Sequence, residues 1–171
     1  YNHVANKDEI LAGLVDLVLA DIDVPTPGEE WRDALRRRAN STRTVFLRHP
    51  WAIGLLETHY RQSSPRRLHY FDGVLGCLRS AGFSNPLAMR AFTILDAYIY
   101  GFIVQELSLA FDDDASLQEV GTDLLRQMAE RFPHLEAVTR EVMEEGYDRG
   151  EEFRFGLDLI LDALERARSG A

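Results

Sequence analysis

The chain has 171 residues, a formal net charge of −9 and one cysteine. Its length is sufficient for one domain with a sizeable core, and a lone cysteine excludes both an internal disulfide and a zinc site built on several cysteines. Because the acidic balance repels phosphate backbones and anionic lipid, any contact with nucleic acid must be local.

The N-terminal region predicts a helix followed by a loop. Asn6 and Glu9 form a capping-box pattern, and apolar residues follow at spacings of three and four, which predicts a helix over residues 7–22. Two prolines and a glycine in residues 23–29 then interrupt the helical ladder. The first residues are polar and show no secretory signal, which favours a cytoplasmic protein.

A second long helix is predicted over residues 29–48. One face of it carries the apolar and small residues Trp31, Leu35, Ala39, Thr42 and Phe46. Around the rest of the helix lie Arg32, Arg36, Arg37, Arg38 and Arg43. Consecutive helical residues diverge by about 100°, so the three adjacent arginines do not form a stripe for nucleic acid. We expect a solvated face paired with Asp33 instead.

Three helices are predicted between residues 50 and 110, the last of them over residues 85–110. Pro50 precedes a short helix, and Ser64 with Pro65 precedes another. The core stripe expected for the latter is Leu68, Phe71, Leu75 and Leu78, with Gly82 as its C-terminal cap. Asn85 begins a long apolar helix. Its run over residues 87–104 has about the length of a bilayer span but contains charged residues, so we interpret it as a buried helix of a soluble protein.

The C-terminal third predicts three more helices. Ser116 with Glu119 is a capping pattern, and Pro133 divides residues 117–145 into two helices. The final helix, over residues 151–168, is apolar on more than one face, which favours an interface of two helices per subunit. No alternation typical of strands occurs, so the predicted fold class is all-α.

The search for catalytic and metal-binding motifs is mostly negative. No nucleophile elbow, phosphate-binding loop, dinucleotide turn or paired-histidine zinc motif is present. His69 and Asp72 are three residues apart but are too few to hold a metal. His59 and Tyr60 could line a small-molecule cavity or form a half-exposed helix end. Asp96, within an apolar helix, needs a partner or a cavity, and Arg90 is too far along the helix to supply one.

The segment "YNHVANKDEIL" resembles the end of the helix-turn-helix of the tetracycline-repressor (TetR) family. Three further segments resemble the ligand-binding and dimerisation domain of that family, in order: "GEEWRDALRRRANSTRTVFLRHP", "SAGFSNPLAMRAFTILDAYIYGFIVQE" and "EEFRFGLDLILDALERA". The resemblance implies an all-α regulatory domain that dimerises through a four-helix bundle. It also implies that residues 1–6 end a DNA-binding domain, 7–22 form a connecting helix, and 23–171 form the ligand-binding and dimerisation domain.

The resemblance also implies particular site residues. Those matching positions that contact DNA phosphates are Tyr1, His3 and Lys7. The ligand-binding candidates are Arg38, Thr42, His59, Tyr60, Asp96 and Tyr98. The dimer-interface candidates are Ile94, Tyr98, Phe102, Phe153, Leu157, Ile160, Leu161 and Leu164. Leu56 stands where the tetracycline-binding members place a magnesium-holding histidine, and Gln105 where they place a glutamate, so a magnesium-chelated tetracycline is not the expected effector.

The sequence thus predicts a TetR-like transcriptional repressor that a small-molecule effector releases from operator DNA. We expect a cytoplasmic homodimer that is not an enzyme and that has no metal or cofactor. One alternative is a stand-alone all-α ligand-binding or interaction module that never contacts DNA. The other is an enzyme that uses His59 and Asp96 as an acid and base pair, which requires the two side chains to converge in a cleft.

Overall fold

The computed structural model describes residues 7–58, 64–108 and 131–170. Within these ranges the fold is all-α, as predicted, with no strand. The helices are α1 (Lys7–Leu19), α2 (Trp31–Arg48), α3 (Trp51–Thr58), α4 (Pro65–Ser80), α5 (Asn85–Ser108), α7 (Pro133–Glu145) and α8 (Arg149–Ser169). The other predicted helix of the 117–145 region lies outside the described residues, as do Tyr1, His3, His59 and Tyr60.

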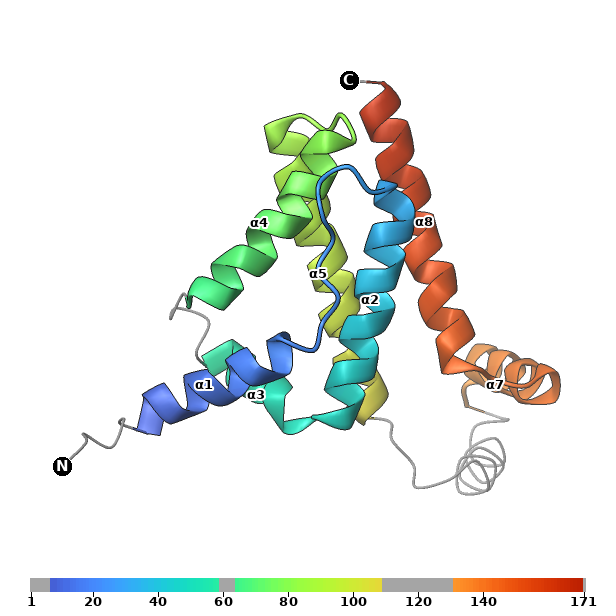
Figure 1. Ribbon diagram of the computed structural model, residues 1–171. Helices are drawn as coiled ribbons and strands as arrows, with labels where there is room; N and C mark the ends of the chain where they lie inside the picture. The colour runs from blue at the N-terminus through green and yellow to red at the C-terminus, as the bar shows by residue number, and fades with distance from the viewer. Residues whose placement is uncertain (1–6, 59–63, 109–130, 171) are drawn as a thin grey trace.

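The helices give the protomer a triangular outline, with α5 at its centre (Figure 1). On one side α5 contacts α2 and α8, and on another it contacts α4. Helix α1 lies across the base of the triangle, where it contacts α3 and α4 (Figure 1). This arrangement places α1, α3, α4 and α5 around a common space.

Helix boundaries follow from local chemistry. Proline occupies the first position of α4, and the Ser64 hydroxyl before it accepts a hydrogen bond from the Arg67 backbone N–H at 3.1 Å. Asp148 caps α8 in the same way, accepting from the Glu151 backbone N–H at 2.8 Å. After α4 the chain reverses at Gly82, whose φ of +92° favours glycine. Three boundaries are therefore fixed by residues visible in the sequence.

The core confirms one predicted stripe and corrects another. All five residues of the predicted α2 face are buried, with Ala39, Thr42 and Phe46 fully enclosed. On α4 the prediction holds only in part: Leu78 is buried and Phe71 and Leu75 are half-buried against the core, but Leu68 is 54% exposed. Arg67, Tyr70, Val74 and Cys77 are buried as well and were not predicted. This face was overlooked because a buried arginine and tyrosine interrupt the apolar pattern by which a core stripe is recognised.

Helix α5 is long and apolar enough, by length and composition, to cross a membrane, and no other helix in the described ranges meets that test. In this fold it packs against three helices of the same chain. Residues Ala88, Ala91, Leu95, Ile99 and Ile103 are buried along that contact. Helix α5 is therefore long enough to contact α2, α4 and α8 at once.

Helix α8 is held at close range to α5 and by ion pairs to α2. A Cβ atom on Gly156 would overlap the hydroxyl and ring of Tyr98, so glycine at this position lets the Tyr98 side chain lie against α8. That hydroxyl donates to the Phe153 carbonyl at 2.9 Å. On the other side, Arg36 Nε donates to Asp158 at 2.8 Å, and Arg32 pairs with Asp162. Polar residues of α8 that interrupt its apolar sequence thus face α2.

Four of the predicted dimer-interface residues lie inside the protomer. Phe153, Leu157, Leu161 and Leu164 are at most 5% exposed, because this stripe of α8 forms part of the core. They are therefore not available to a partner chain, which corrects the prediction. The large apolar residues that α8 exposes are Phe155 and Leu159, on a different face.

Candidate ligand-binding cavity

A cavity of about 520 Å³ lies between α1, α3, α4 and α5. Its wall is mostly apolar, which is typical of sites for small organic molecules. The lining residues are Leu19, Ile53, Leu56, Arg67, Tyr70, Phe71, Asp96, Tyr100, Gly101, Val104 and Gln105. A second space of about 380 Å³ shares Leu19 and Tyr70 with it and lies between α1, the loop after α1 and α4.

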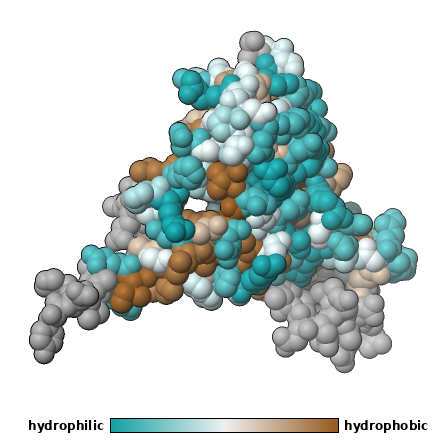
Figure 2. Space-filling view, in the orientation of Figure 1, coloured by the Kyte–Doolittle hydropathy of each residue, from teal (hydrophilic) through white to brown (hydrophobic). Residues whose placement is uncertain are grey.

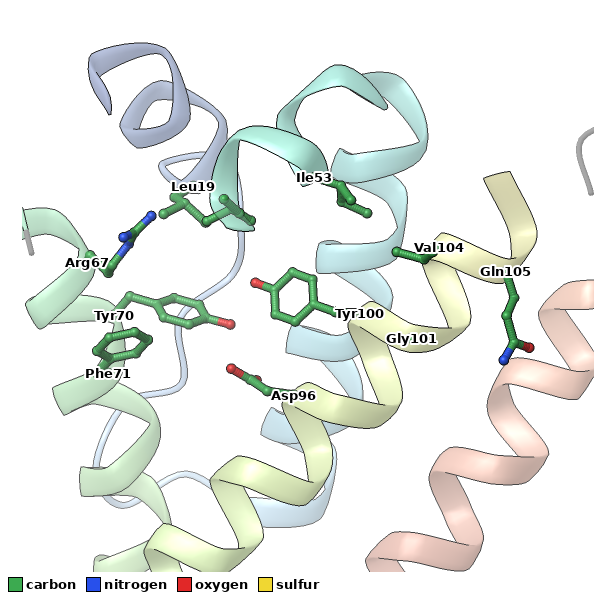
Figure 3. A pocket seen from close by; sticks show the side chains of 11 residues that line it. Leu19, Ile53, Arg67, Tyr70, Phe71, Asp96, Tyr100, Gly101, Val104 and Gln105 are labelled. Atoms are coloured by element: carbon green, nitrogen blue, oxygen red, sulfur yellow. The ribbon is translucent and has the colours of Figure 1, made fainter. Parts of the chain in front are cut away.

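Figure 3 shows the polar ends of Tyr70, Asp96 and Tyr100 pointing toward one another in this cavity. Asp96 and Tyr100 are one turn apart on α5, whereas Tyr70 comes from α4. The two tyrosine hydroxyls lie close enough that Tyr70 helps to raise the pKa of Tyr100. Burial raises the pKa of both hydroxyls above the ordinary value, so both are neutral donors at physiological pH.

Arg38 closes this polar cluster from α2. The residue is fully buried; its Nε donates to the Tyr70 hydroxyl at 2.6 Å, and its Nη2 donates to Asp96 Oδ1. Its guanidinium also lies over the rings of Tyr70 and Phe92, at 5.0 and 5.6 Å from their centroids. Nη1 is the one buried side-chain nitrogen or oxygen in the described residues that has no hydrogen-bond partner.

Arg38 and Asp96 form a pair with opposing influences on their protonation. Burial lowers the pKa of Arg38, but the neighbouring Tyr70 and Asp96 outweigh that effect and hold it above its ordinary value. For Asp96 burial dominates and raises the pKa, while Arg38 lowers it in part. A carboxylate in this position is therefore costly, and Arg38 is the group that keeps it ionised.

The structure brings some of the predicted ligand-binding residues together and not others. Asp96, expected to need a partner or a cavity, has both, because it lines the cavity and pairs with Arg38. Arg38 and Thr42 lie behind the wall, and the Thr42 hydroxyl donates to the Arg38 carbonyl at 2.8 Å. Tyr98 is not a lining residue; its ring stacks on Phe153 of α8 at a centroid distance of 5.6 Å.

The expectation that Arg38 belongs to a solvated face is wrong. Arg36 does pair with Asp33 at 3.2 Å, as expected. Arg38, two positions on, points to the opposite side of α2 and into the core. The signal that could have revealed it is its spacing of three and four from Leu35 and Thr42, both predicted to be buried.

Arg67, Tyr70 and Tyr100 also line the cavity and were not predicted from the sequence. Tyr100 stands four residues after Asp96, a spacing that places both on one helical face. Arg67 and Tyr70 are likewise three apart on α4. Nothing in the sequence shows that these two faces meet. Among the described residues, no group of three His, Cys, Asp or Glu side chains is placed to hold a metal ion.

Comparison with known proteins gives a consistent result. Residues 24–168 match the family described as tetracyclin repressor-like, C-terminal domain. An HTH-type transcriptional regulator of Saccharopolyspora erythraea is 29% identical over 136 residues, covering 79% of this chain and 57% of the relative. The HTH-type transcriptional repressor DrrR1 of Streptomyces coeruleorubidus is 26% identical, covering 96% of this chain and 63% of the relative. The chain therefore spans about three fifths of the length of these curated relatives.

A solved structure shows the same fold. The TetR family protein ActR of Streptomyces coelicolor, determined in complex with actinorhodin, superposes with a TM-score of 0.76. The two sequences are 22% identical, and the similarity covers 98% of this chain and 80% of that one. The all-α arrangement of Figure 1 is therefore similar to the fold of this TetR family protein.

Proposed function

The chain belongs to the tetracyclin repressor-like C-terminal domain family, and from this premise we propose that it is the effector-binding and dimerisation part of a transcriptional repressor. Its curated relatives are regulators, among them a named repressor, and not enzymes. In the proposal, a small molecule binds in the helical domain and releases the protein from operator DNA. The protein would act in the cytoplasm as a homodimer.

The observation that carries the proposal is the 520 Å³ cavity with its polar cluster. Its size and apolar wall suit a small organic molecule, and the polar groups at one side supply orientation. The solved relative ActR, with actinorhodin bound, supports a similar use of this domain here.

Helix α1 connects the cavity to the DNA-binding part in this proposal. Leu19, at its C-terminal end, lines the cavity, while Lys7, at its N-terminal end, is exposed. A ligand that contacts Leu19 and shifts α1 would move whatever precedes Lys7. The proposed contacts to DNA phosphates remain Tyr1, His3 and Lys7. In the proposed division of the chain, residues 1–6 end the helix-turn-helix, residues 7–22 form the connecting helix and residues 23–171 form the regulatory domain. Release then requires only that the ligand prefers one of two dimer states.

Dimerisation is proposed through the exposed faces of α5 and α8. Met89 and Ile94 on α5 are about half exposed, and so are Phe155 and Leu159 on α8. Two such helices from each protomer would form a four-helix bundle. This assignment keeps Ile94 and the partly exposed Tyr98, Phe102 and Ile160 from the sequence prediction. It replaces the buried α8 stripe with residues that a partner can reach.

A DNA-release assay tests the proposal. We expect the longer protein, with a helix-turn-helix before this chain, to retard a DNA fragment from upstream of its own gene in a gel. Compounds that raise its melting temperature in a thermal-shift screen of drugs and metabolites should then release the fragment. A protein that binds such compounds but never binds DNA would instead be the stand-alone module. A protein that binds DNA and is released by none of them would contradict effector control.

A further inference from the structure

We propose that the ligand of this cavity is an uncharged aromatic molecule that carries a hydroxyl group, and that this hydroxyl donates to Asp96. The inference rests on the proposed function of the cavity as an effector site. It is argued from the charges on the cavity wall, from the unused oxygen of Asp96 and from the lining rings.

The charges at the cavity wall favour an uncharged ligand, and the first of them are those of the Arg38–Asp96 pair. Both groups are largely enclosed, with side-chain exposures of 1% and 21%, and they neutralise one another. The other charged lining residue, Arg67, is buried and already takes part in an interaction of its own. A cationic ligand would add a third positive charge near Arg38 and Arg67. An anionic ligand at this position would face the Asp96 carboxylate. Both arrangements are costly away from water, so an uncharged ligand is favoured.

The two carboxylate oxygens of Asp96 differ in their hydrogen bonding. Arg38 occupies Oδ1, and no described residue donates to Oδ2. Asp96 lines the cavity, and in Figure 3 its carboxylate is turned toward the space beside Tyr70 and Tyr100. Oδ2 is therefore an acceptor that has no donor among the described residues. A ligand hydroxyl can donate to it and can also accept from a tyrosine hydroxyl, which neither an ammonium nor a carboxylate can do.

Aromatic rings line part of the cavity and favour a flat ligand. Tyr70, Phe71 and Tyr100 line one part of the cavity, and aliphatic Leu19, Ile53 and Leu56 line another. Tyr70 and Phe71 are arranged edge to face, at a centroid distance of 5.9 Å. Such a wall gives a flat ring both stacking and apolar contacts. The ligand is therefore expected to combine an aromatic ring system with a hydroxyl on one edge.

Four anthracene derivatives of nearly equal size test the inference, because their own fluorescence reports binding. They carry at the same ring position a hydroxymethyl, a methyl, a carboxylate or an aminomethyl group. The hydroxymethyl compound should bind the 171-residue chain about tenfold more tightly than the methyl compound, since a hydrogen bond to an ionised group is worth about that factor. Both charged compounds should bind more weakly than the hydroxymethyl compound.

A variant makes the test specific to Asp96. In Asp96→Asn the wall loses its negative charge while Arg38 and Arg67 remain, so the carboxylate compound should gain affinity and the hydroxymethyl compound should lose it. A general loss of structure would weaken all four compounds alike and would not reverse their order. The matched control is Asp158→Asn, which makes the same substitution in the partner of Arg36 on the outer side of α2. This control should leave the order of affinities of the four compounds unchanged.

The outcomes separate this inference from the proposed function. Equal binding of the methyl and hydroxymethyl compounds, or tightest binding of a charged one, would overturn the inference while leaving the cavity a binding site. An unchanged order in Asp96→Asn would overturn it as well. Absence of binding by all four compounds would also overturn it, whereas the proposed function is decided separately by the DNA-release assay. The comparison on the unsubstituted chain stands even if the variant fails to fold.

Discussion

Two arginines on opposite sides of α2 show what burial does to one type of side chain. Arg36 is 36% exposed and pairs with Asp158, which is 49% exposed, at 2.8 Å. Arg38 is 1% exposed and pairs with Asp96, which lines the cavity. The two residues are separated by a single position in the sequence. The outer pair joins two helices at the surface, whereas the inner pair shapes the polar end of the cavity.

The difference lies in what each charge would meet if its partner were removed. At the outer face water replaces the partner, so little is lost. At the inner face nothing replaces it, and the remaining charge is left in a medium that solvates it poorly. Substitutions on the two sides of α2 should therefore have effects of very different size.

The largest effect is expected from Arg38→Met. The variant leaves Asp96 buried without its cation, which should lower the free energy of unfolding by about 3–5 kcal/mol, measured by urea denaturation. Adding Asp96→Leu removes the stranded carboxylate, so the double variant should recover a large part of that loss. A double variant less stable than Arg38→Met would contradict the interpretation of the two residues as a pair.

A smaller effect is expected where α8 meets α5 without any ion pair. Alanine at Gly156 would place its Cβ against the Tyr98 ring, so either that ring or the helices must shift to admit it. We expect Gly156→Ala to lower the free energy of unfolding by about 1–3 kcal/mol. Gly13→Ala is the control, because it adds a methyl to open space on α1 and should be neutral or slightly stabilising. Equal effects of the two substitutions would show that the close approach is not needed.

The pH dependence should have opposite signs at the two faces. The hydrogen bond from Arg32 lowers the pKa of Asp162, so that pair stabilises the fold above about pH 4 and is lost as pH falls through the lowered value. Burial raises the pKa of Asp96, so the fold loses stability as pH rises from about 4 through the raised value. Urea denaturation of Asp162→Asn and Asp96→Asn beside the unsubstituted chain, over pH 3 to 7, measures both slopes. If the contributions of Asp162 and Asp96 to the free energy of unfolding changed with pH in the same direction, the contrast between the two faces of α2 would be wrong.

The smallest effect is expected from Asp158→Asn at the outer face. The exposed pair with Arg36 should contribute less than about 1 kcal/mol, and added salt should reduce that contribution further. Urea denaturation in low and high salt measures it. A loss comparable with that of Arg38→Met would mean that exposure does not distinguish the two arginines.

Much of the fold could be predicted from the sequence because its signals are local. Ser64 with Pro65 begins α4, Gly82 follows its end, and the face of α2 from Trp31 to Phe46 is buried as the spacing predicts. Capping, the fixed φ of proline and helical periodicity act within a few residues. The all-α class and the resemblance to the TetR family follow from the same kind of information, and residues 24–168 match that family.

The candidate site was only partly predictable, because it is made by helices that are distant in the sequence. Asp96 stood out as a carboxylate in an apolar helix, and its need for a partner or a cavity was foreseen. Its cation, Arg38, is 58 positions away and was one of three consecutive arginines with the same local appearance. Tyr70, which joins the cluster from α4, lies on a face that the apolar pattern did not mark.

The sequence by itself therefore determined which segments are helical, where most of them end and which family they belong to. The tertiary structure decided which arginine of Arg36, Arg37 and Arg38 enters the core, which stripe of α8 a partner can reach, and which side chains share the cavity. The physical reason is that helix formation depends on residues a turn apart, whereas burial and charge pairing depend on how whole helices are placed against one another. For Arg38, that placement puts the charge in the core, paired with a carboxylate that lines the cavity.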